Sequence, residues 1–256
     1  MIIAVDIGNT EISLGILKGK RVWDRYSIES NLSLAQLKVE LKRKLNHIKR
    51  KHPSLEGAIV CSVVPKILNV VQKSLQAQLN LKPKILGKNL IVPIKNKYKN
   101  PKQVGQDRLV GAYAAKQLYG LPTLIIDFGT AITFDYVSIN GDYEGGIILP
   151  GIRLSAETLF KKTALLPKVQ NIRGPRSLIG KDTRESILSG LFYGYGAMSQ
   201  GLIELITKKV KGSPKVVITG GYTQVMKRFI AKKIHKIDKD LVFKGMALLH
   251  AQVKET

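Results

Sequence analysis

The chain has 256 residues, of which 44% are hydrophobic, so it is long enough to bury one large core or two cores of ordinary size. Its 42 basic and 18 acidic side chains give a net charge of +24, and the regular apolar clusters exclude a disordered basic tail. We expect no membrane span, no signal peptide ahead of Asp6 and no internal disulfide, because Cys61 is the one cysteine, and this is typical of a cytoplasmic protein.

The first half of the chain alternates predicted strands and helices. An apolar strand over residues 3–5 leads to Asp6 and a tight turn, and further strands are predicted at 11–17, 21–28, 58–64 and near Ile85. Helices are predicted at 32–50 and 65–79. The first of them is amphipathic, with lysines on its polar face, which indicates a lysine-biased surface. We therefore do not expect nucleic acid as a partner, although so positive a field attracts polyanions, including nucleotides.

The second half repeats this order. Residues 2–10 read IIAVDIGNT and residues 123–131 read TLIIDFGTA, which aligns Asp6 with Asp127 and Gly8 with Gly129, 121 residues apart. Strands are predicted at 132–139, 146–149 and 216–219, and helices at 153–160, at 183–209 and towards the end. The duplication predicts an α/β fold of two lobes with mixed sheets, at residues 1–119 and 120–256, with a nucleotide cleft between them.

Glycine turns end three of the predicted strands. Two are the Asp-x-Gly turns, and the third is Thr219-Gly220-Gly221-Tyr222. A single Asp before Gly is commonly only a turn former. Two copies that face each other across a cleft indicate a phosphate site more strongly, and hydroxyls are offered there by Thr10, Thr130 and Thr133. The reason is that the N–H groups of glycine turns bind phosphate oxygens, while carboxylates hold the cation that accompanies the phosphate. The three turns together indicate phosphoryl chemistry.

Other common nucleotide and metal motifs are absent from the sequence. It contains neither the lysine-bearing P-loop nor the Gly-x-Gly-x-x-Gly of dinucleotide-binding folds. Cys61 falls in a predicted buried strand and is interpreted as a core thiol. The four histidines lack metal-ligand spacing and are interpreted as surface or packing residues: His47, His52, His235 and His250.

Further motifs run through nearly the whole chain. They are Asp6-x-Gly-Asn-Thr10, Tyr98-x-Asn-Pro101, Gly105-Gln-Asp-Arg108, Asp127-x-Gly-Thr-Ala-x-Thr133, Gly145-Gly-x-x-x-Pro-Gly151, Thr183 and Thr219-Gly-Gly221. With these motifs the sequence resembles the type III pantothenate kinases of the actin-like ATPase superfamily. The two Asp-Gly hairpins belong to the whole superfamily, whereas the Gly-x-Asp-Arg motif with Tyr98 upstream narrows the resemblance to this family.

The resemblance implies an enzyme with two actin-like (ribonuclease H-like) lobes that phosphorylates pantothenate with ATP, the first step of coenzyme A biosynthesis. Asp107 resembles the general base. Asp127 resembles the ligand of a monovalent cation, K⁺ or NH₄⁺, and Asp6 would orient Mg²⁺ through the phosphates. ATP would be bound by Asp6, Ile7, Gly8, Asn9, Thr10, Glu11, Ile12, Ser13 and Thr130. Pantothenate would be bound by Tyr98, Gly105, Gln106, Asp107, Arg108 and Thr183.

Simpler structural roles remain open for some of these residues. Asp107 would serve only structure if it formed a salt bridge with Arg108. Thr183 lies in Asp182-Thr-Arg-Glu185, which has the spacing of a helix capping box. Glu11 stands where the family more often has a neutral polar residue, and an extra anion there is expected to weaken ATP binding.

Two alternative functions are kept beside the kinase. One is another small-molecule kinase of the same superfamily that acts on a sugar or a carboxylate. The other is a non-catalytic regulator that keeps the fold and binds nucleic acid through its positive charge. The presence of Asp6, Asp107 and Asp127 together argues against a dead enzyme.

Residues 182–209 predict a homodimer. They combine an apolar helical face with Gly190, Gly194, Gly196 and Gly201, and each glycine lowers helix propensity by roughly 1 kcal/mol relative to alanine. Such a helix is expected to pack closely against another backbone, either within the subunit or in a second copy. The resembling family is dimeric, with pantothenate bound near the subunit interface, which favours the second copy.

Overall fold

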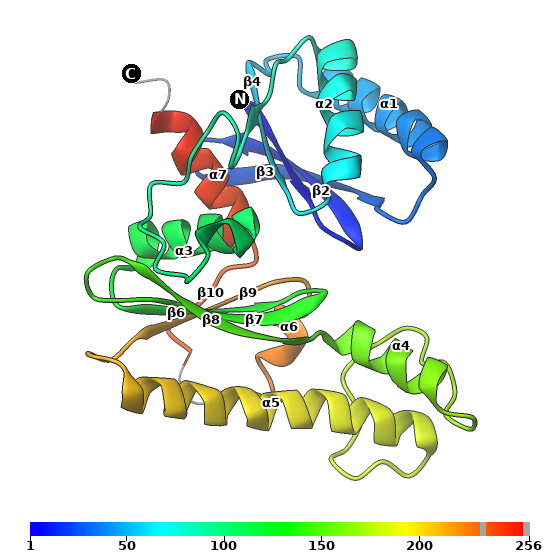
Figure 1. The fold of residues 1–256 in the computed structure, drawn as a ribbon. Coiled ribbons are helices and arrows are strands. Elements are labelled where there is room, and N and C mark those ends of the chain that lie inside the picture. Colours follow the sequence, from blue (N-terminus) through cyan, green and yellow to red (C-terminus); the bar gives the residue numbers. More distant parts are fainter. Residues whose placement is uncertain (231–233, 253–256) are drawn as a thin grey trace. The chain divides into compact units, whose positions relative to one another are not determined.

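The computed structural model describes residues 1–230 and 234–252, which form two compact units (Figure 1). Unit 1 contains residues 1–94 and 98–114 and the described chain from Asp240 on, and unit 2 contains residues 95–97 and the remainder up to Lys239. In contrast to a division at residue 119, the last helix, α7 (Leu241–Gln252), therefore belongs to unit 1. The reason is that α7 contacts the sheet of that unit.

The sheet of unit 1 has the strand order β3-β2-β1-β4-β5. A tight turn joins β1 to β2, so these two strands and β3 are antiparallel, whereas β4 and β5 follow helices and run parallel to β1. The strands are β1 (Ile2–Ile7), β2 (Glu11–Lys18), β3 (Arg21–Glu29), β4 (Gly57–Ser62) and β5 (Lys84–Ile85).

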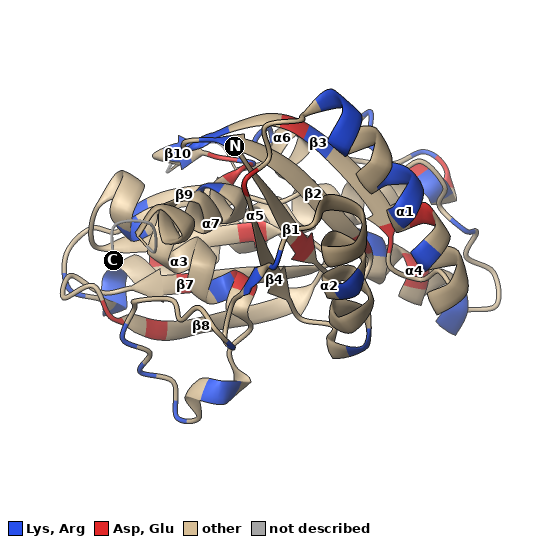
Figure 2. Cartoon of the chain, turned by 90° about the horizontal axis from the view of Figure 1, so that it is seen from above, with Lys and Arg blue, Asp and Glu red and all other residues tan. Residues whose placement is uncertain are grey.

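Helices α1 (Leu34–Lys51) and α2 (Pro65–Leu79) share one apolar core with this sheet. The predicted amphipathic face of α1 is buried, and Lys and Arg occupy much of its other side (Figure 2). Ser33 begins α1, because its side chain accepts a hydrogen bond from the Gln36 N–H and its own N–H donates one to Oε1 of the Gln36 side chain. Pro65 occupies the first turn of α2, where its missing N–H is not needed.

The sheet of unit 2 has the order β10-β9-β6-β7-β8, which repeats unit 1 strand for strand. Here β6, β7 and β8 are antiparallel neighbours, and β9 and β10 are parallel to β6. The predicted duplication is thus confirmed, with β6 in the place of β1. The strands are β6 (Thr123–Phe128), β7 (Ala131–Val137), β8 (Tyr143–Pro150), β9 (Lys215–Thr219) and β10 (Lys236–Ile237).

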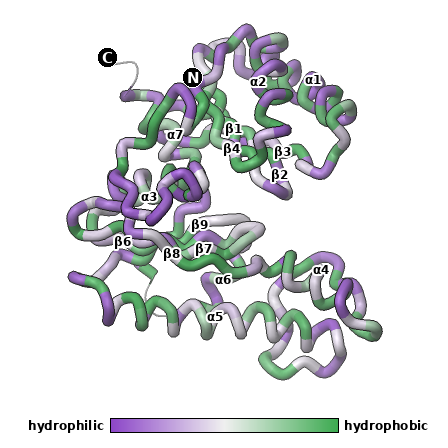
Figure 3. The backbone as a smooth tube through the Cα atoms, in the orientation of Figure 1, coloured by the Kyte–Doolittle hydropathy of each residue, from purple (hydrophilic) through white to green (hydrophobic). Residues whose placement is uncertain are grey.

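The core of unit 2 lies between its sheet and helices α4 (Ile152–Lys162), α5 (Thr183–Lys209) and α6 (Thr223–Met226). Phe128 and Phe134 of the sheet and Phe192 of α5 are fully buried there. Figure 3 shows the contrast between the hydrophobic central strands and the mixed character of α5, whose glycines and polar residues interrupt its apolar positions.

The positive charge is distributed over both units. Figure 2 shows Lys and Arg on helices, strand ends and loops throughout the described chain, as expected for a lysine-biased surface. Among the described helices, none combines the length and the apolar character that a membrane crossing needs.

Candidate active site

The first Asp-Gly turn joins β1 to β2 in unit 1. The strands pair up to Ile7 opposite Ile12, so residues 8–11 form a four-residue turn. The turn is closed by a hydrogen bond of 3.0 Å from the Gly8 N–H to the Glu11 carbonyl. Asp6 lies opposite Ser13 in the ladder. Because successive residues of a strand alternate between faces, both lie on the opposite face of the sheet from the apolar core that Ile7 and Ile12 join.

Acidic groups crowd the Asp6 carboxylate. Asp6 keeps an intermediate exposure, yet the surrounding protein raises its pKa from 3.8 to about 7. Burial is the main cause, and the charges of Asp107 and Glu11 add to it, while a hydrogen bond from the Cys61 thiol acts in the opposite direction. Burial and the nearby Asp6 and Asp107 charges also raise the pKa of Cys61 well above its usual value, so Cys61 is a buried thiol, as predicted. A cation bound here would relieve the repulsion.

Asp107 is placed by helix α3 (Gln106–Tyr119), which the sequence patterns did not predict as a helix. It lies in the first turn, where its Oδ1 accepts a hydrogen bond of 2.9 Å from the Arg108 N–H. A carboxylate is favoured at this end of a helix by the orientation of the peptide dipoles. Asp107 and Arg108 are both partly buried, and the charge of Asp107 acts on Asp6. The structure therefore brings the predicted base and the first turn together within unit 1.

The other predicted pantothenate residues have different surroundings. Tyr98 is partly buried in unit 1, and the Gln106 side chain lies against Gly87 in the same unit. Thr183 is exposed at the start of α5 in unit 2. The preceding Asp182 caps that helix, because its Oδ1 accepts a hydrogen bond of 2.8 Å from the Glu185 N–H. The predicted helix start at this segment is thus confirmed, and a substrate contact of Thr183 stays a prediction.

The second Asp-Gly turn joins β6 to β7 in unit 2. Phe128 pairs with Ile132, so this turn has three residues, one fewer than the turn in unit 1. A hydrogen bond of 3.2 Å from the Gly129 N–H to the Ala131 carbonyl closes it. Asp127 lies opposite Thr133, whose hydroxyl donates a hydrogen bond of 2.9 Å to Asp135.

Two further glycines enclose this second turn. The Gly151 N–H donates a hydrogen bond of 3.0 Å to the Thr130 carbonyl, and a Cβ on Gly151 would clash with the Gly129 and Thr130 carbonyl oxygens. Gly220 has φ +96°, and a Cβ there would clash with Asp127 Oδ1 and the Phe128 backbone. The third predicted glycine turn therefore lies directly against the second one. This proximity of two glycine turns is typical of a backbone site for an anion.

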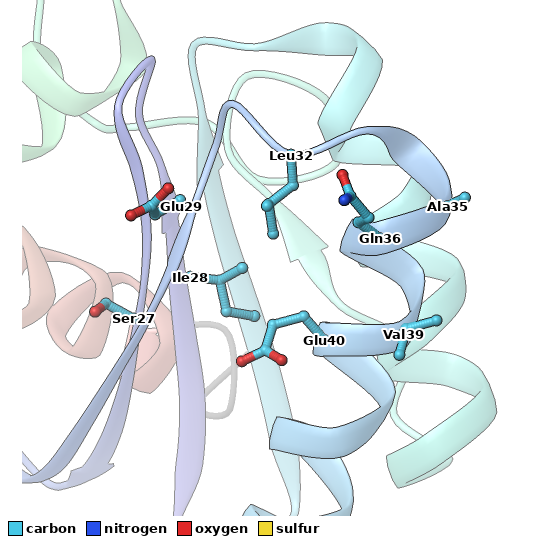
Figure 4. Close-up of a pocket in the computed structure, with 8 residues that line it drawn as sticks. All are labelled: Ser27, Ile28, Glu29, Leu32, Ala35, Gln36, Val39 and Glu40. Atoms are coloured by element: carbon cyan, nitrogen blue, oxygen red, sulfur yellow. The ribbon is translucent and has the colours of Figure 1, made fainter.

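A groove lies elsewhere in unit 1, between β3 and α1. It has a volume of about 650 Å³ and is lined by Ile28, Leu32 and Val39 together with the carboxylates of Glu29 and Glu40 (Figure 4). Apolar walls and two anions do not suit nucleotide phosphates. A smaller pocket of about 220 Å³ is lined by Glu11 and Ser13 and also by Arg25 and Phe243.

Comparison with known proteins decides the family. The model of the type III pantothenate kinase family matches residues 2–205. A type III pantothenate kinase from Persephonella marina is 42% identical over 229 residues, which cover 88% of this chain and 89% of that one. The chain belongs to the type III pantothenate kinase family. The motif-based resemblance is thus confirmed, and with it the kinase class of the protein.

Solved structures with lower identity support the fold of this type III pantothenate kinase. A Baf family protein from Campylobacter jejuni superposes with a TM-score of 0.61 at 20% identity, with both chains covered completely. The polyphosphate/ATP-glucomannokinase of an Arthrobacter strain superposes with a TM-score of 0.51 at 15% identity and covers 98% of each chain. At these identities the likeness shows the shared α/β architecture and nothing about substrates.

The residues that sequence reasoning missed are those that hold the two turns. Ser30 and Gly151 donate hydrogen bonds to turn carbonyls, and neither was selected for that role. Gly151 belongs to a family motif, but the motif does not show which carbonyl group accepts a hydrogen bond from its N–H. Across the described residues, no group of three or more His, Cys, Asp and Glu side chains is arranged to hold a metal by itself.

Proposed function

We propose that this type III pantothenate kinase transfers the γ-phosphoryl group of ATP to the primary hydroxyl of pantothenate, which gives 4′-phosphopantothenate and ADP, in the first step of coenzyme A biosynthesis. Family membership over residues 2–205 supports the reaction. The observation that supports the site is the pairing of Asp107, at the head of α3, with the Asp6 turn in one unit.

Asp107 is the general base of the proposed reaction. The hydroxyl oxygen of pantothenate forms a bond to the γ-phosphorus while the bond from that phosphorus to the β–γ bridging oxygen breaks, and ADP leaves. The hydroxyl proton passes to the Asp107 carboxylate. Such help is typically worth about 10²–10⁴ in rate. The backbone N–H of Arg108 donates a hydrogen bond to one carboxylate oxygen of Asp107, so the base is oriented before the substrate arrives.

In unit 1 the phosphates of ATP are bound by the turn after Asp6, with Asn9 and Thr10, and an ATP contact of Thr130 stays a prediction. The Asp6 region also suits Mg²⁺, because hard carboxylate oxygens are the ligands this ion takes. Burial is the main cause of the raised pKa of Asp6, and the charge of Asp107 adds to it. When bound, Mg²⁺ neutralises charge on the phosphoryl oxygens. Glu11 adds to the same negative field, and we propose that it lowers the affinity for free ATP more than that for Mg·ATP.

Asp127 binds a monovalent cation in this proposal. Its carboxylate oxygen Oδ1 lies against Gly220, and such an oxygen is a suitable ligand for K⁺ or NH₄⁺. Activity should therefore require K⁺ or NH₄⁺ in addition to Mg²⁺, and Asp127→Ala should remove the response to these ions. Full activity of the unchanged protein in a buffer with sodium as its only monovalent cation would contradict the assignment.

Pantothenate is anionic at one end. We propose that Arg108 pairs with its carboxylate, because a guanidinium offers two parallel donors to such a group. Tyr98 provides a second contact within unit 1, and a contact of Thr183 stays a prediction.

A homodimer is supported by one face of α5. A Cβ on Gly190, Gly194 or Gly201 would meet no atom of the described residues within 4 Å, and their spacing of four and seven residues puts them on one side of the helix. Only Gly196 packs closely inside the unit, against the backbone of Phe229. The close approach that these three glycines permit is thus available to a second copy.

Sedimentation tests the dimer. We expect the unchanged protein to have twice its chain mass of 28.3 kDa at micromolar concentration. Gly194→Arg should give the monomer, whereas Gln76→Arg, the same side chain added to the exposed surface of α2, should leave the mass unchanged. A monomeric unchanged protein would refute the dimer.

A coupled assay of ADP release, with and without pantothenate, tests the function. Release that depends on pantothenate, with phosphopantothenate identified by mass, would support it. Release with a sugar or another carboxylate in its place would indicate a different kinase. Absence of turnover together with salt-resistant nucleic-acid binding would favour a regulator.

A further inference from the structure

Ser30 follows the last residue of β3 and holds the first phosphate turn at two points. Its hydroxyl donates a hydrogen bond of 2.7 Å to the Gly8 carbonyl, and its N–H donates one of 3.0 Å to the Thr10 carbonyl. Both acceptors belong to the four-residue turn between β1 and β2. Ser30 is partly buried, so water competes little for these bonds.

Unit 2 contains one of these two bonds at the equivalent place. Strand β8 is the counterpart of β3 in the strand order, and Gly151 follows its last residue as Ser30 follows β3. The Gly151 N–H donates to the Thr130 carbonyl just as the Ser30 N–H donates to the Thr10 carbonyl. The backbone bond is therefore a feature of the duplicated fold. The hydroxyl bond is an addition of unit 1, since glycine has no side chain.

The hydroxyl bond from Ser30 matters because it determines the direction in which the Gly8 carbonyl group points. Three carbonyls of the first turn are acceptors within the protein: Gly8 and Thr10 bond to Ser30, and Glu11 bonds to the Gly8 N–H. A turn binds an anion when its N–H groups, and not its carbonyl oxygens, face the anion. Gly8 has no Cβ to restrict its backbone, and its turn is one residue longer than that of unit 2. Without the Ser30 hydroxyl, the Gly8 peptide is the one most able to rotate.

We propose that Ser30 is a positioning residue of the first phosphate turn: its hydroxyl fixes the Gly8 peptide, so that the N–H groups of the turn face the phosphates of ATP. This role rests on the proposed use of that turn for ATP. It requires no contact between Ser30 and either substrate. It also gives a role to the hydroxyl side chain at the start of the loop between β3 and α1.

Ser30→Ala removes the hydroxyl bond and keeps the backbone bond. We expect KM for ATP to rise about two- to tenfold, the loss typical of one neutral hydrogen bond, while KM for pantothenate stays unchanged. Ser30→Thr keeps the hydroxyl and should restore the normal KM for ATP. Ser33→Ala is the matched control, because it removes a serine hydroxyl three residues away that accepts a hydrogen bond of 3.2 Å from the Gln36 N–H at the start of α1. It should lower Tm and leave KM for ATP unchanged.

Mg·ATP affinity measured by calorimetry on the same variants separates this proposal from the proposed reaction. If the unchanged protein binds Mg·ATP but does not phosphorylate pantothenate, the reaction is refuted and the affinities still decide the role of Ser30. A weaker affinity in Ser30→Ala that Ser30→Thr restores supports it. Affinity unchanged in Ser30→Ala, or lowered equally in Ser33→Ala, would overturn it, as would an unchanged protein that does not bind Mg·ATP.

Discussion

The hairpins β1–β2 and β6–β7 show what a duplicated element keeps and what it changes. Both place an Asp two residues before a glycine at the end of the first strand, opposite a hydroxyl residue of the second strand. In both, the N–H of the residue after the third strand bonds a threonine carbonyl of the turn. The duplicated element thus keeps both its backbone bond and the side chains at the end of its first strand.

The surroundings of the two turns differ in kind. In unit 1 the turn has four residues, and the charges of Glu11 and Asp107 act on Asp6 and help raise its pKa to about 7. In unit 2 the turn has three residues and is enclosed by Gly151 and Gly220, where any side chain would clash. One copy thus has a concentration of charge and the other a fixed backbone shape. The first suits a metal and a proton acceptor, and the second suits backbone contacts to an anion.

The largest effect should come from Asp107, which lies near the charged turn of unit 1. Asp107→Asn keeps the shape and one acceptor oxygen but removes the basicity. We expect kcat to fall by roughly two to four orders of magnitude, with Mg·ATP affinity little changed, because the turn after Asp6 remains intact. Steady-state kinetics and calorimetry measure the two quantities separately.

Asp6→Asn serves as the counterpart, since its main effect should be a lower affinity for Mg·ATP. A near-normal kcat in Asp107→Asn would show that Asp107 only pairs with Arg108, and the base would have to be another group.

The next-largest effect should come from the close packing around the turn of unit 2. Gly220→Ala places a methyl group against Asp127 Oδ1 and within 2.6 Å of Phe128 backbone atoms, at a φ of +96° that alanine avoids. Strain of this kind typically costs about 1–3 kcal/mol, so we expect Tm to fall and the response to K⁺ to weaken. The neighbouring Gly221 is the matched control, because a Cβ there meets nothing within 4 Å. Gly221→Ala should change Tm and activity little, and equal effects of the two variants would refute the enclosed geometry.

Much of this arrangement follows from local sequence patterns. The helices at Pro65–Leu79 and Thr183–Lys209 begin and end as predicted, because a proline at one start and a capping aspartate at the other mark them. The duplication was visible because both hairpins combine an apolar run with Asp-x-Gly. Their pairing into two sheets of matching order follows from that repeat.

The remaining features depend on contacts between distant residues. Helix α3 has a weak amphipathic pattern, since Val110, Ala112, Tyr113, Ala114 and Ala115 are buried in succession, so its periodicity gave no signal. The two-residue strands β5 and β10 are too short for any alternation to show. The bond from Ser30 to Gly8 spans 22 residues, and no local pattern predicts such a pair.

The smallest effect measures how strongly burial and the neighbouring charges act on Asp6. Because the folded protein raises the pKa of Asp6 from 3.8 to about 7, folding favours the protonated carboxyl. The favourable contribution is complete below about pH 4 and is lost as the pH rises to about 7. Asp6→Asn cannot ionise, so without nucleotide it should melt roughly 3–6 °C above the unchanged protein at pH 8 and at nearly the same temperature at pH 4.

Asp24 provides a control of opposite sign in the same unit. Hydrogen bonds of 2.7 Å from the Lys51 ammonium group and the Tyr26 hydroxyl hold its pKa well below the usual range. Its contribution is therefore present above about pH 4 and is lost in acid, so Asp24→Asn should lower Tm at pH 8 and have less effect as the pH falls below 4. Excess Mg·ATP should reverse the order for Asp6, because it stabilises the unchanged protein more than Asp6→Asn. If Asp6→Asn and the unchanged protein melt at the same temperature throughout this pH range, burial and the neighbouring charges do not raise the pKa of Asp6, and the contrast in charge between the two turns is refuted.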